Sequence, residues 1–313
     1  MTQQLSIVLP AYNECQHIRM IHDQLIAVLN TLPTDTYTYE LIYINDGSRD
    51  ATWSEITKLA QTYEYVKWIN FSRNFGKELA LTAGLEHAKG DCVITIDCDG
   101  QHPVSQIPHF IDARAGGYDI VYNRRPEIAG ASRVKKVTSK MFYRFFNKIS
   151  EFKLEPWTTD YRLIDRKVID VYLQFGEKNR IYRGLIDRVG FSKTCLVFDA
   201  LPSPQGRIAS YNYTKLIKLA TDSITSFSLF PLKVVGYLGL LIMMWSGSIA
   251  VFILSTVFFL SNRYGFTNVG FLTIVNIFLG GIMMTSLGLI AIYIANIHDE
   301  VRHRPLYIIK DRI

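Results

Sequence analysis

Cys92-Val93-Ile94-Thr95-Ile96 followed by Asp97-Cys98-Asp99 is the stretch from which the fold follows. Its first five residues form a short apolar run rich in β-branched side chains, which is typical of a buried strand. Two carboxylates come directly after that strand, at the edge where open α/β sheets bind ligands. Paired carboxylates suit a hard divalent cation that carries a diphosphate. Because Asp-x-Asp is also common in solvated loops, the remainder of the chain decides between these interpretations.

Short β-rich runs alternate with helical patterns over the first 125 residues. The predicted strands are residues 5–9, 40–45, 66–71, 92–96 and 119–122. Between the first two lie Ile18, Ile21, Leu25 and Leu29 at helical spacing. A second helix is predicted after Asp50, with Thr52 and Glu55 spaced as a capping box. This alternation predicts a mostly parallel, doubly wound α/β sheet.

Polar loops follow each of the first four predicted strands. They read Pro10-Ala11-Tyr12-Asn13-Glu14, Asn45-Asp46-Gly47-Ser48, Ser72-Arg73-Asn74-Phe75-Gly76-Lys77 and Asp97-Cys98-Asp99-Gly100-Gln101. Each loop alone is ordinary turn chemistry. Their shared edge predicts one ligand site, in which Asp46 can accept from a uracil N–H or ribose hydroxyls and Tyr12 can pack on a base.

Two long stretches without a charged side chain occupy the last third of the chain, at residues 234–262 and 264–297. Each exceeds the roughly 20 residues that cross about 30 Å of hydrocarbon, and soluble core helices rarely run so long without a charge. Only Arg263 lies between them, whereas basic residues flank both outer ends: Lys215, Lys218, Lys233, Arg302, Arg304, Lys310 and Arg312. The positive-inside rule therefore predicts two membrane spans with both chain ends in the cytoplasm.

Other composition signals agree with a cytosolic main domain. Met1-Thr2-Gln3-Gln4 leads directly into a predicted strand, so no signal peptide is expected. The four cysteines show no metal-type spacing and fit free thiols in a reducing compartment. The net charge of +6 favours contact with anionic lipid and phosphates, and no basic run interleaved with aromatics points to nucleic acid.

Together with these loops, four further motifs resemble a known family nearly from end to end. They are Asp160-Tyr161-Arg162-Leu163, Arg183-Gly184-Leu185, Ile224-Thr225-Ser226-Phe227-Ser228 and Arg304-Pro305-Leu306-Tyr307-Ile308-Ile309-Lys310. The chain resembles family 2 glycosyltransferases of GT-A fold. Within them it is most similar to the polyprenyl-phosphate glycosyltransferases, which include bactoprenol glucosyltransferases and dolichyl-phosphate mannose synthases.

The resemblance implies a domain organisation and a location. Residues 1–210 would form a cytosolic GT-A domain with a Rossmann-like, mostly parallel sheet. Residues 211–230 would form an interfacial amphipathic helix, 231–297 two transmembrane helices, and 298–313 a cytosolic tail. The protein would be a homo-oligomer in the plasma membrane of a prokaryote, with its catalytic domain in the cytoplasm.

The resemblance also implies residue roles. The nucleotide-sugar would be bound by Pro10, Tyr12, Glu14, Ile44, Asp46, Lys77, Asp97 and Cys98. Asp99 and Gln101 would hold Mg²⁺ or Mn²⁺, and Asp99 and Asp160 would be catalytic. The implied reaction transfers a sugar, with inversion, from a nucleoside-diphosphate sugar to polyprenyl phosphate. Among bactoprenol glucosyltransferases that sugar is glucose from UDP-glucose and the lipid is undecaprenyl phosphate.

The acceptor chemistry leaves the role of Asp160 open. A phosphate monoester is largely a dianion at neutral pH and needs little help from a base. Asp160 therefore acts as a base, orients the acceptor or sugar, or has a purely structural role as a partner of Arg162 or a helix cap. The lipid phosphate needs cations, and the candidates are Arg124, Arg133, Lys135, Lys136 and Arg207, with Arg183 behind them. Residues 135–152 form a basic amphipathic pattern, which fits a bilayer surface and a core-packing helix equally.

Three other interpretations compete with this one. A processive polysaccharide synthase requires more than two transmembrane helices and a Gln-x-x-Arg-Trp motif, which the sequence lacks. The same transfer reaction with N-acetylglucosamine or mannose is compatible with all the motifs. A non-enzymatic scaffold would have lost its carboxylates, whereas Asp46, Asp97 and Asp99 are all present.

Overall fold

The computed structural model describes most of the first 200 residues and part of the last 80. The described residues are 2–124, 158–178, 180–197, 237, 241, 244, 245, 248, 268–302 and 305–312. By its internal contacts the chain divides into two units. The first comprises Met1–Asn147, Phe152–Ser210 and Arg304–Ile313, and the second Lys148–Glu151 and Tyr211–His303.

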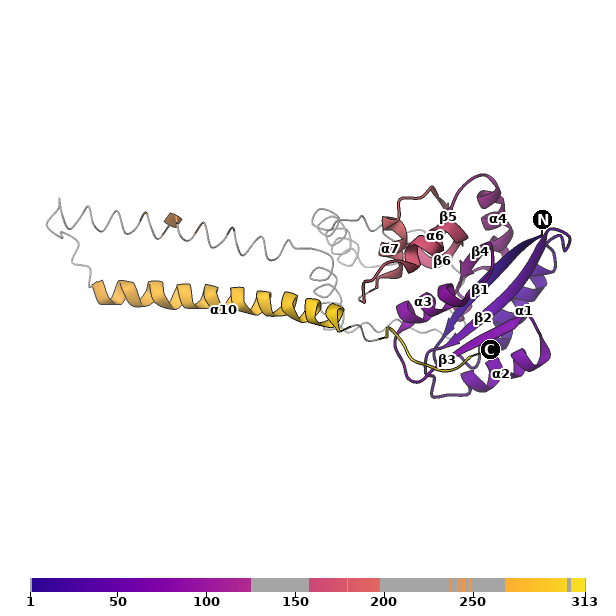
Figure 1. Ribbon diagram of the computed structural model, residues 1–313, viewed down its shortest axis with the longest axis horizontal. Coiled ribbons are helices and arrows are strands. Elements are labelled where there is room, and N and C mark those ends of the chain that lie inside the picture. Colours follow the sequence, from indigo (N-terminus) through magenta and orange to yellow (C-terminus); the bar gives the residue numbers. More distant parts are fainter. Residues whose placement is uncertain are drawn as a thin grey trace, which may run out of the picture. The chain divides into compact units, whose positions relative to one another are not determined.

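The first unit is built on one sheet, which has eight strands among the described residues and the order β7-β5-β6-β4-β1-β2-β3-β8 (Figure 1). The strands are β1 Gln3–Ala11, β2 Tyr37–Asn45, β3 Val66–Phe71, β4 Cys92–Thr95, β5 Ile120–Arg124, β6 Thr158–Asp165, β7 Lys193–Val197 and β8 Ile309–Arg312. Strands β4, β1, β2 and β3 run parallel to one another, and β5 runs parallel to β7. The predicted mostly parallel α/β sheet is confirmed, and the five predicted strands are all present.

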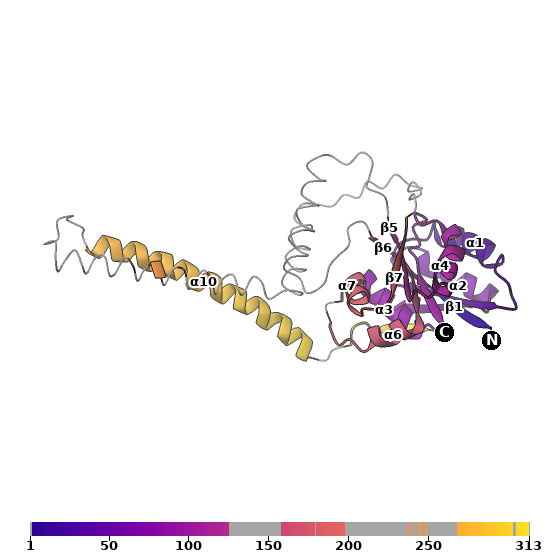
Figure 2. The ribbon, with the colours of Figure 1, turned by 90° about the horizontal axis from the view of Figure 1, so that it is seen from above.

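Helices cover both faces of this sheet, as Figure 2 shows. One face packs against α1 (Ile18–Leu29), α2 (Thr52–Thr62) and α4 (Ile107–Ala115), which follows a short 3-10 turn at Val104–Gln106. The other face packs against α3 (Lys77–His87), α6 (Arg166–Leu173) and α7 (Tyr182–Arg188). Because both faces are covered, the central strands carry buried apolar residues on both faces: in β1, Leu5, Ile7 and Leu9 pack on one side and Val8 on the other. Helix α1 buries the four residues predicted for its core face.

The predicted capping box at the start of α2 is wrong. Thr52 is the first residue of the helix rather than its N-cap, and the N-cap residue, Ala51, has no side chain that could accept a hydrogen bond from the helix N–H groups. The Thr52 hydroxyl instead donates to Asp50 Oδ1 at 2.5 Å and accepts from the N–H of Glu14 at 2.8 Å. Asp50 Oδ1 also accepts from the N–H of Thr52. These bonds join the loop after β1 to the start of α2, and this tertiary contact outweighs the local capping pattern.

Strand β6 was not predicted as a strand, and its direction determines the site. It is inserted between β4 and β5 and runs antiparallel to both. Its first residues, Thr158 to Asp160, therefore lie at the edge where the parallel strands β1, β4 and β5 end. A polar residue from the distant part of the chain is in this way brought to the predicted ligand-binding edge.

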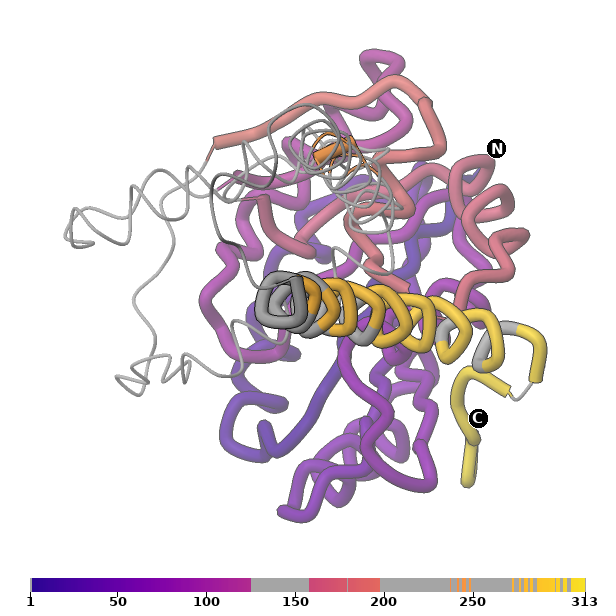
Figure 3. Tube along the Cα trace, turned by 90° about the vertical axis from the view of Figure 1, so that its left-hand side faces the viewer, coloured from indigo at the N-terminus to yellow at the C-terminus, as the bar shows by residue number. Residues whose placement is uncertain are grey.

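The C-terminal segment returns to the first unit as an edge strand. Strand β8 pairs antiparallel with β3, and the N–H of Ser72 donates to the Ile308 carbonyl at 3.0 Å (Figures 1 and 3). The ring of Tyr307 stacks on Phe71 with a centroid distance of 5.0 Å. The end of the segment predicted as a cytosolic tail thus covers the otherwise open edge of the sheet.

The second unit is described mainly by α10 (Asn268–Val301), a helix of 34 residues. Among the described residues, no helix has the length and apolarity required of a bilayer span. The predicted span at 234–262 lies outside the described residues except for isolated positions, and the start of the one at 264–297 also lies outside them. The predicted helices at 135–152 and 211–230 are likewise not described.

Candidate active site

Three charged side chains meet at the carboxyl edge of the sheet. The Nζ of Lys77 lies 2.6 Å from Asp97 Oδ1 and 2.7 Å from Asp160 Oδ2. Asp97 follows β4, Asp160 is in β6, and Lys77 is the first residue of α3. The ammonium group of Lys77 therefore lies between two carboxylates that the sequence separates by 63 residues.

The local sequence explains how Lys77 reaches this place. Gly76 precedes it with φ at 100°, a conformation that side-chain-bearing residues rarely adopt, and α3 begins immediately afterwards. The Lys77 side chain is 41% exposed, whereas that of Asp160 is 9% exposed. Burial alone would lower the pKa of Lys77, but the charges of Asp97 and Asp160 outweigh it and raise that pKa well above its usual value.

Asp160 has a second cationic partner. The Nε of Arg183, from α7, lies 2.9 Å from Asp160 Oδ1, and Arg183 Nη1 donates to the Thr158 carbonyl. Burial alone would raise the pKa of Asp160, but Lys77 and Arg183 outweigh it and lower that pKa. A carboxylate with a lowered pKa is a weak proton acceptor. The arrangement favours an orienting role for Asp160 over that of a general base.

A group of metal-ligand type lies next to these charges. Ligand atoms of Asp97, Asp99 and His102 all lie within 4.8 Å of one another. His102 Nε2 is 3.4 Å from Asp97 Oδ2, and the His102 ring is buried beside Tyr161. Burial alone would raise the pKa of Asp97, but Lys77 and His102 hold it well below its ordinary range. Two carboxylates and an imidazole at this spacing fit a divalent cation.

Gln101, the second metal ligand implied by the resemblance, is half-buried beside this group. Its backbone N–H donates to Asp99 Oδ1 at 3.0 Å, which closes the turn after β4. His102 was not among the predicted ligands. The signal that could have revealed it is its position three residues after Asp99, where one turn brings both side chains to the same point.

The Asp46 carboxylate accepts hydrogen bonds from the loop that precedes α3. It accepts from the N–H of Phe75 at 2.7 Å, the N–H of Gly76 at 3.0 Å and the side-chain amide of Asn74 at 2.9 Å. Burial raises the pKa of Asp46, and the bonds from Phe75 and Gly76 only partly offset this. Asp46 therefore holds the loop that leads into α3 and Lys77, and its predicted contact with the base or ribose stays a prediction.

The loop after β1 is held against the loop after β2. Asn13, with φ at 57°, donates its N–H to Ser48 Oγ, and Glu14 Oε2 lies 2.6 Å from His17 Nδ1. Pro10 lies near the end of β1, and Tyr12 stands 41% exposed just beyond it. An exposed ring on a fixed loop is available to pack on a base.

Two of the predicted nucleotide-binding residues have side chains in the hydrophobic core. Ile44 is fully buried in β2, and Cys98 is 1% exposed beneath the turn after β4. Burial raises the pKa of the Cys98 thiol well above its usual value. Their side chains pack in the core, so a contact of either residue with the nucleotide-sugar would come from its backbone.

Among the predicted acceptor-binding cations, Arg124 is described and is exposed at the end of β5. It pairs in register with Thr158, two residues before Asp160. The other four, Arg133, Lys135, Lys136 and Arg207, lie outside the described residues.

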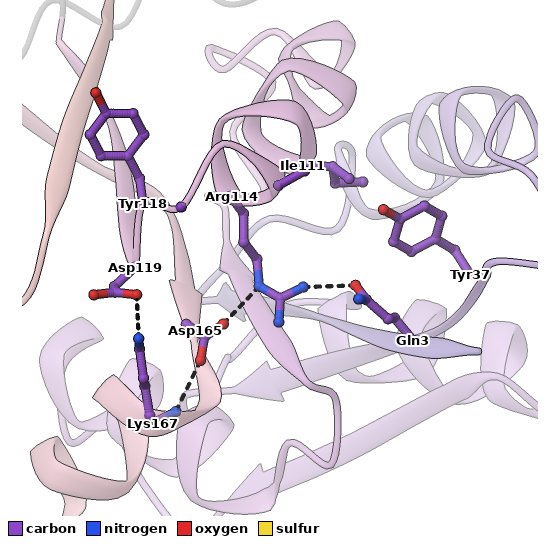
Figure 4. A pocket seen from close by; sticks show the side chains of 10 residues that line it. Gln3, Tyr37, Ile111, Arg114, Tyr118, Asp119, Asp165 and Lys167 are labelled. Atoms are coloured by element: carbon purple, nitrogen blue, oxygen red, sulfur yellow. Dashed lines mark hydrogen bonds and ion pairs between the residues drawn. The ribbon is translucent and has the colours of Figure 1, made fainter. Parts of the chain in front are cut away.

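A cavity lies at the opposite edge of the sheet, where the parallel strands begin (Figure 4). It measures about 350 Å³ and includes Gln3, Arg114, Asp119, Asp165 and Lys167. The guanidinium group of Arg114 binds Asp165 at 2.8 Å and Gln3 at 2.8 Å, and Lys167 pairs with Asp119 at 2.6 Å. Because these charges neutralise one another, this cavity lacks the free charge that a phosphate or metal site requires.

The fold, together with the charged cluster at the carboxyl edge of the sheet, defines a class of enzyme. Residues 6–173 match the profile of the family described as glycosyl transferase family 2. The match covers more than half of the chain and includes the Asp97, Asp99 and Asp160 positions. The chain belongs to glycosyl transferase family 2, and its first unit is a GT-A domain.

Curated relatives are similar over almost the whole chain. An uncharacterized glycosyltransferase of Synechocystis sp. is 42% identical over 99% of this chain and 96% of its own length. Bactoprenol glucosyl transferase of Shigella phage SfV is 38% identical over 98% of each chain. The putative glycosyltransferase CsbB of Bacillus subtilis is 37% identical over 98% of this chain and 91% of its own.

Solved structures are more distant. A mannosyltransferase of Pyrobaculum calidifontis, in complex with GDP-Man and Mn²⁺, is 16% identical with a TM-score of 0.46. The alignment covers 66% of this chain and 59% of that one. Glucosyl-3-phosphoglycerate synthase of Mycobacterium tuberculosis, in complex with Mn²⁺, UDP and glucosyl-3-phosphoglycerate, is 17% identical with a TM-score of 0.46. The alignment covers 71% of this chain and 78% of that one.

Proposed function

We propose that this protein transfers glucose from UDP-glucose to polyprenyl phosphate, with inversion, at the cytoplasmic face of a prokaryotic membrane. The observation that carries the proposal is the cluster of Asp97, Lys77 and Asp160 beside Asp99 and His102. This cluster lies in a chain that is 38% identical, over nearly its full length, to a bactoprenol glucosyl transferase.

The donor end of the site is assigned to the loops after β1, β2 and β4. Tyr12 packs on the base, and Asp99 with His102 and Gln101 holds Mg²⁺ or Mn²⁺. Such an ion would neutralise the charge that develops on the departing diphosphate. Asp97 and Lys77 are placed to hold the sugar and its phosphates, because the ammonium group of Lys77 is partly exposed beside Asp97.

The acceptor end is assigned to Arg124, Arg183 and Asp160. Arg124 supplies a guanidinium that can bind two phosphate oxygens at once. Asp160 is nearly buried between Lys77 and Arg183 and keeps its charge, so it orients the substrates instead of removing a proton. The lipid phosphate requires no base because it is already largely ionised at neutral pH.

The proposal includes a membrane anchor with two spans, at residues 234–262 and 264–297. It rests on the two uncharged stretches and the basic residues outside them. The carrier lipid resides in the bilayer, so an anchor keeps the GT-A domain next to its acceptor. We also propose that the protein assembles as a homo-oligomer in the membrane.

The test uses the purified full-length protein in lipid nanodiscs with undecaprenyl phosphate. UDP-glucose, UDP-N-acetylglucosamine and GDP-mannose, each with a radiolabelled sugar, are supplied in parallel with Mg²⁺ or Mn²⁺. We expect label in the lipid fraction from UDP-glucose, one sugar per lipid, and none with the Asp97→Asn variant. If the label comes from another donor, the sugar named in the proposal is wrong and that donor's sugar replaces it. A growing polymer would indicate a processive synthase. No lipid-linked sugar from any donor would refute the proposal.

A further inference from the structure

We propose that Glu78 is a positioning residue for the transfer reaction, whose carboxylate holds the start of α7 so that Arg183 stays paired with Asp160. This inference rests on the proposed function, because it assigns a role within the same site. No motif in the sequence pointed to Glu78, and the family resemblance gave it no role.

The first contact joins α3 to α7. Glu78 follows Lys77 in the first turn of α3. Its Oε2 accepts from the backbone N–H of Tyr182 at 2.7 Å, and Tyr182 is the first residue of α7. The two residues are 104 positions apart in sequence, so the contact exists only in the folded chain.

The second contact joins α7 to the site. Arg183, the residue after Tyr182, places its Nε 2.9 Å from Asp160 Oδ1 and donates from Nη1 to the Thr158 carbonyl at 2.7 Å. Asp160 in turn binds Lys77, which precedes Glu78 in the chain. The contacts therefore form a closed ring through α3, β6 and α7, and loss of the Glu78 bond opens it.

A third contact makes Tyr182 the pivot of this ring. The hydroxyl of Tyr182 lies 2.9 Å from Thr95 Oγ1. The Thr95 hydroxyl in turn donates to the Asp160 carbonyl at 2.5 Å. Tyr182 is fully buried. Asp160 is thus held at its backbone through Tyr182 and at its side chain through Arg183, and Glu78 fixes the residue pair from which both contacts come.

The charge of Glu78 matters for the strength of this contact. Burial and, to a lesser extent, the nearby charge of Asp160 raise the pKa of Glu78 to about 7, although the N–H of Tyr182 and the charges of Arg183 and Lys77 partly offset them. An ionised carboxylate accepts a hydrogen bond more strongly than a protonated one. The ring should therefore tighten as pH rises through about 7.

The kinetic test compares Glu78→Ala and Glu78→Gln with a matched control. Glu55 also lies in the first turn of an 11-residue helix, but its partner is Lys58, so Glu55→Ala removes the same kind of charge away from the ring. We expect Glu78→Ala to lower kcat about 10- to 100-fold, as small misplacements of reacting groups do. Glu55→Ala should leave kcat unchanged.

Two further readouts separate positioning from a general loss of structure. Glu78→Gln keeps an acceptor oxygen, so it should retain more of the rate but lack the rise in kcat near pH 7. The acceptor phosphate also ionises near this pH, but it does so equally with the wild-type enzyme and with Glu78→Gln. The difference between the two pH profiles of kcat therefore reports on Glu78. Combining Glu78→Ala with Arg183→Ala should cost less than the sum of the two single variants, because both weaken the contact between Arg183 and Asp160. Unchanged kcat in Glu78→Ala, or an unchanged pH profile in Glu78→Gln, would overturn the inference.

Hydrogen exchange gives a readout that does not require activity. In Glu78→Ala the amides of α7 should exchange faster, whereas in Glu55→Ala they should not. If the wild-type enzyme transfers no sugar while α7 loosens only in Glu78→Ala, the proposed function fails and the link between Glu78 and α7 stands. If α7 exchanges equally in all three proteins, the inference fails whatever the activity.

Discussion

Lys77 Nζ lies 2.7 Å from Asp160 Oδ2, although one residue opens a helix and the other lies in a strand 83 positions later. The same ammonium group contacts Asp97. One lysine thus neutralises two carboxylates at the edge where the donor diphosphate is expected.

Lys77→Met should lower kcat/KM about 10²- to 10³-fold, the usual cost of removing one electrostatic contact from an active site. It removes the positive charge between Asp97 and Asp160 and leaves them to repel each other. Steady-state kinetics on the full-length enzyme measure the effect. Lys67→Met, at an exposed position of β3, is the matched control. Wild-type kinetics in Lys77→Met would show that the lysine is structural only.

Asp99→Asn should abolish metal-dependent transfer while the protein stays folded. The change removes one hard oxygen charge from the group of Asp97, Asp99 and His102. Activity is measured across a Mg²⁺ and Mn²⁺ titration, and the melting temperature checks the fold. Asp112→Asn, at an exposed position of α4, should behave as wild type. Full turnover in excess chelator, or by Asp99→Asn, would refute a metal role.

Arg124→Ala should raise the KM for polyprenyl phosphate about tenfold or more and change the KM for the nucleotide sugar little. A charge-assisted bond to phosphate is worth about 1.5–3 kcal/mol, and the donor diphosphate has other cations nearby. Arg124→Lys should rescue poorly, because an ammonium cannot bind two oxygens in a fixed fork. Varying each substrate separately decides the matter. A weakened donor KM with an unchanged acceptor KM would place Arg124 at the donor.

Gly47→Ala should destabilise the fold by about 2–4 kcal/mol, well above a simple conformational cost of about 1–2 kcal/mol for a positive φ. Gly47 has φ at 64°, and an added Cβ would come within 2.3 Å of the Arg73 backbone. Gly117→Ala is the control, because φ there is also positive but no atom lies within 4 Å of the added Cβ. Thermal melts compare the two. Equal shifts would mean that the close approach to Arg73 costs nothing.

Stability should fall with acidification through His22. This ring is 1% exposed, and its Nε2 has no hydrogen-bond partner among the described residues. Burial lowers the pKa of His22, and Arg19 lowers it further against the opposing charge of Asp23. The unfolded state therefore binds the proton more readily, so the free energy of unfolding decreases as pH drops below about 6.5.

The measurement for His22 is the melting temperature between pH 7.5 and 5. His22→Phe keeps an aromatic ring beside Tyr63, whose centroid lies 4.9 Å from that of His22, and it cannot bind a proton. We expect the variant to lose less stability than the wild type over this range. If the melting temperatures of the two proteins fall in parallel as pH drops, His22 is not the cause of the lost stability.

The core elements of the first unit could be predicted because their signals are local. The apolar run ending at Ile96 and the spacing of Ile18, Ile21, Leu25 and Leu29 match the period of one strand and one helix, and both elements formed as expected. The shared edge also followed from sequence, because parallel strands joined by helices all end on the same side. The predicted capping at Thr52 failed because its hydroxyl accepts from the N–H of Glu14 and donates to Asp50 instead of capping the helix.

What the sequence alone determined was therefore the α/β alternation, the set of loops at one edge and the pair of carboxylates after Ile96. What only the tertiary structure decided was the partner of each charge. Strand β6 runs antiparallel between β4 and β5, which places Asp160 beside Lys77, and the start of α7 reaches Glu78 across 104 residues. The physical reason is that periodicity records which face of an element is buried, whereas a salt bridge depends on which elements become neighbours, and no local pattern encodes this.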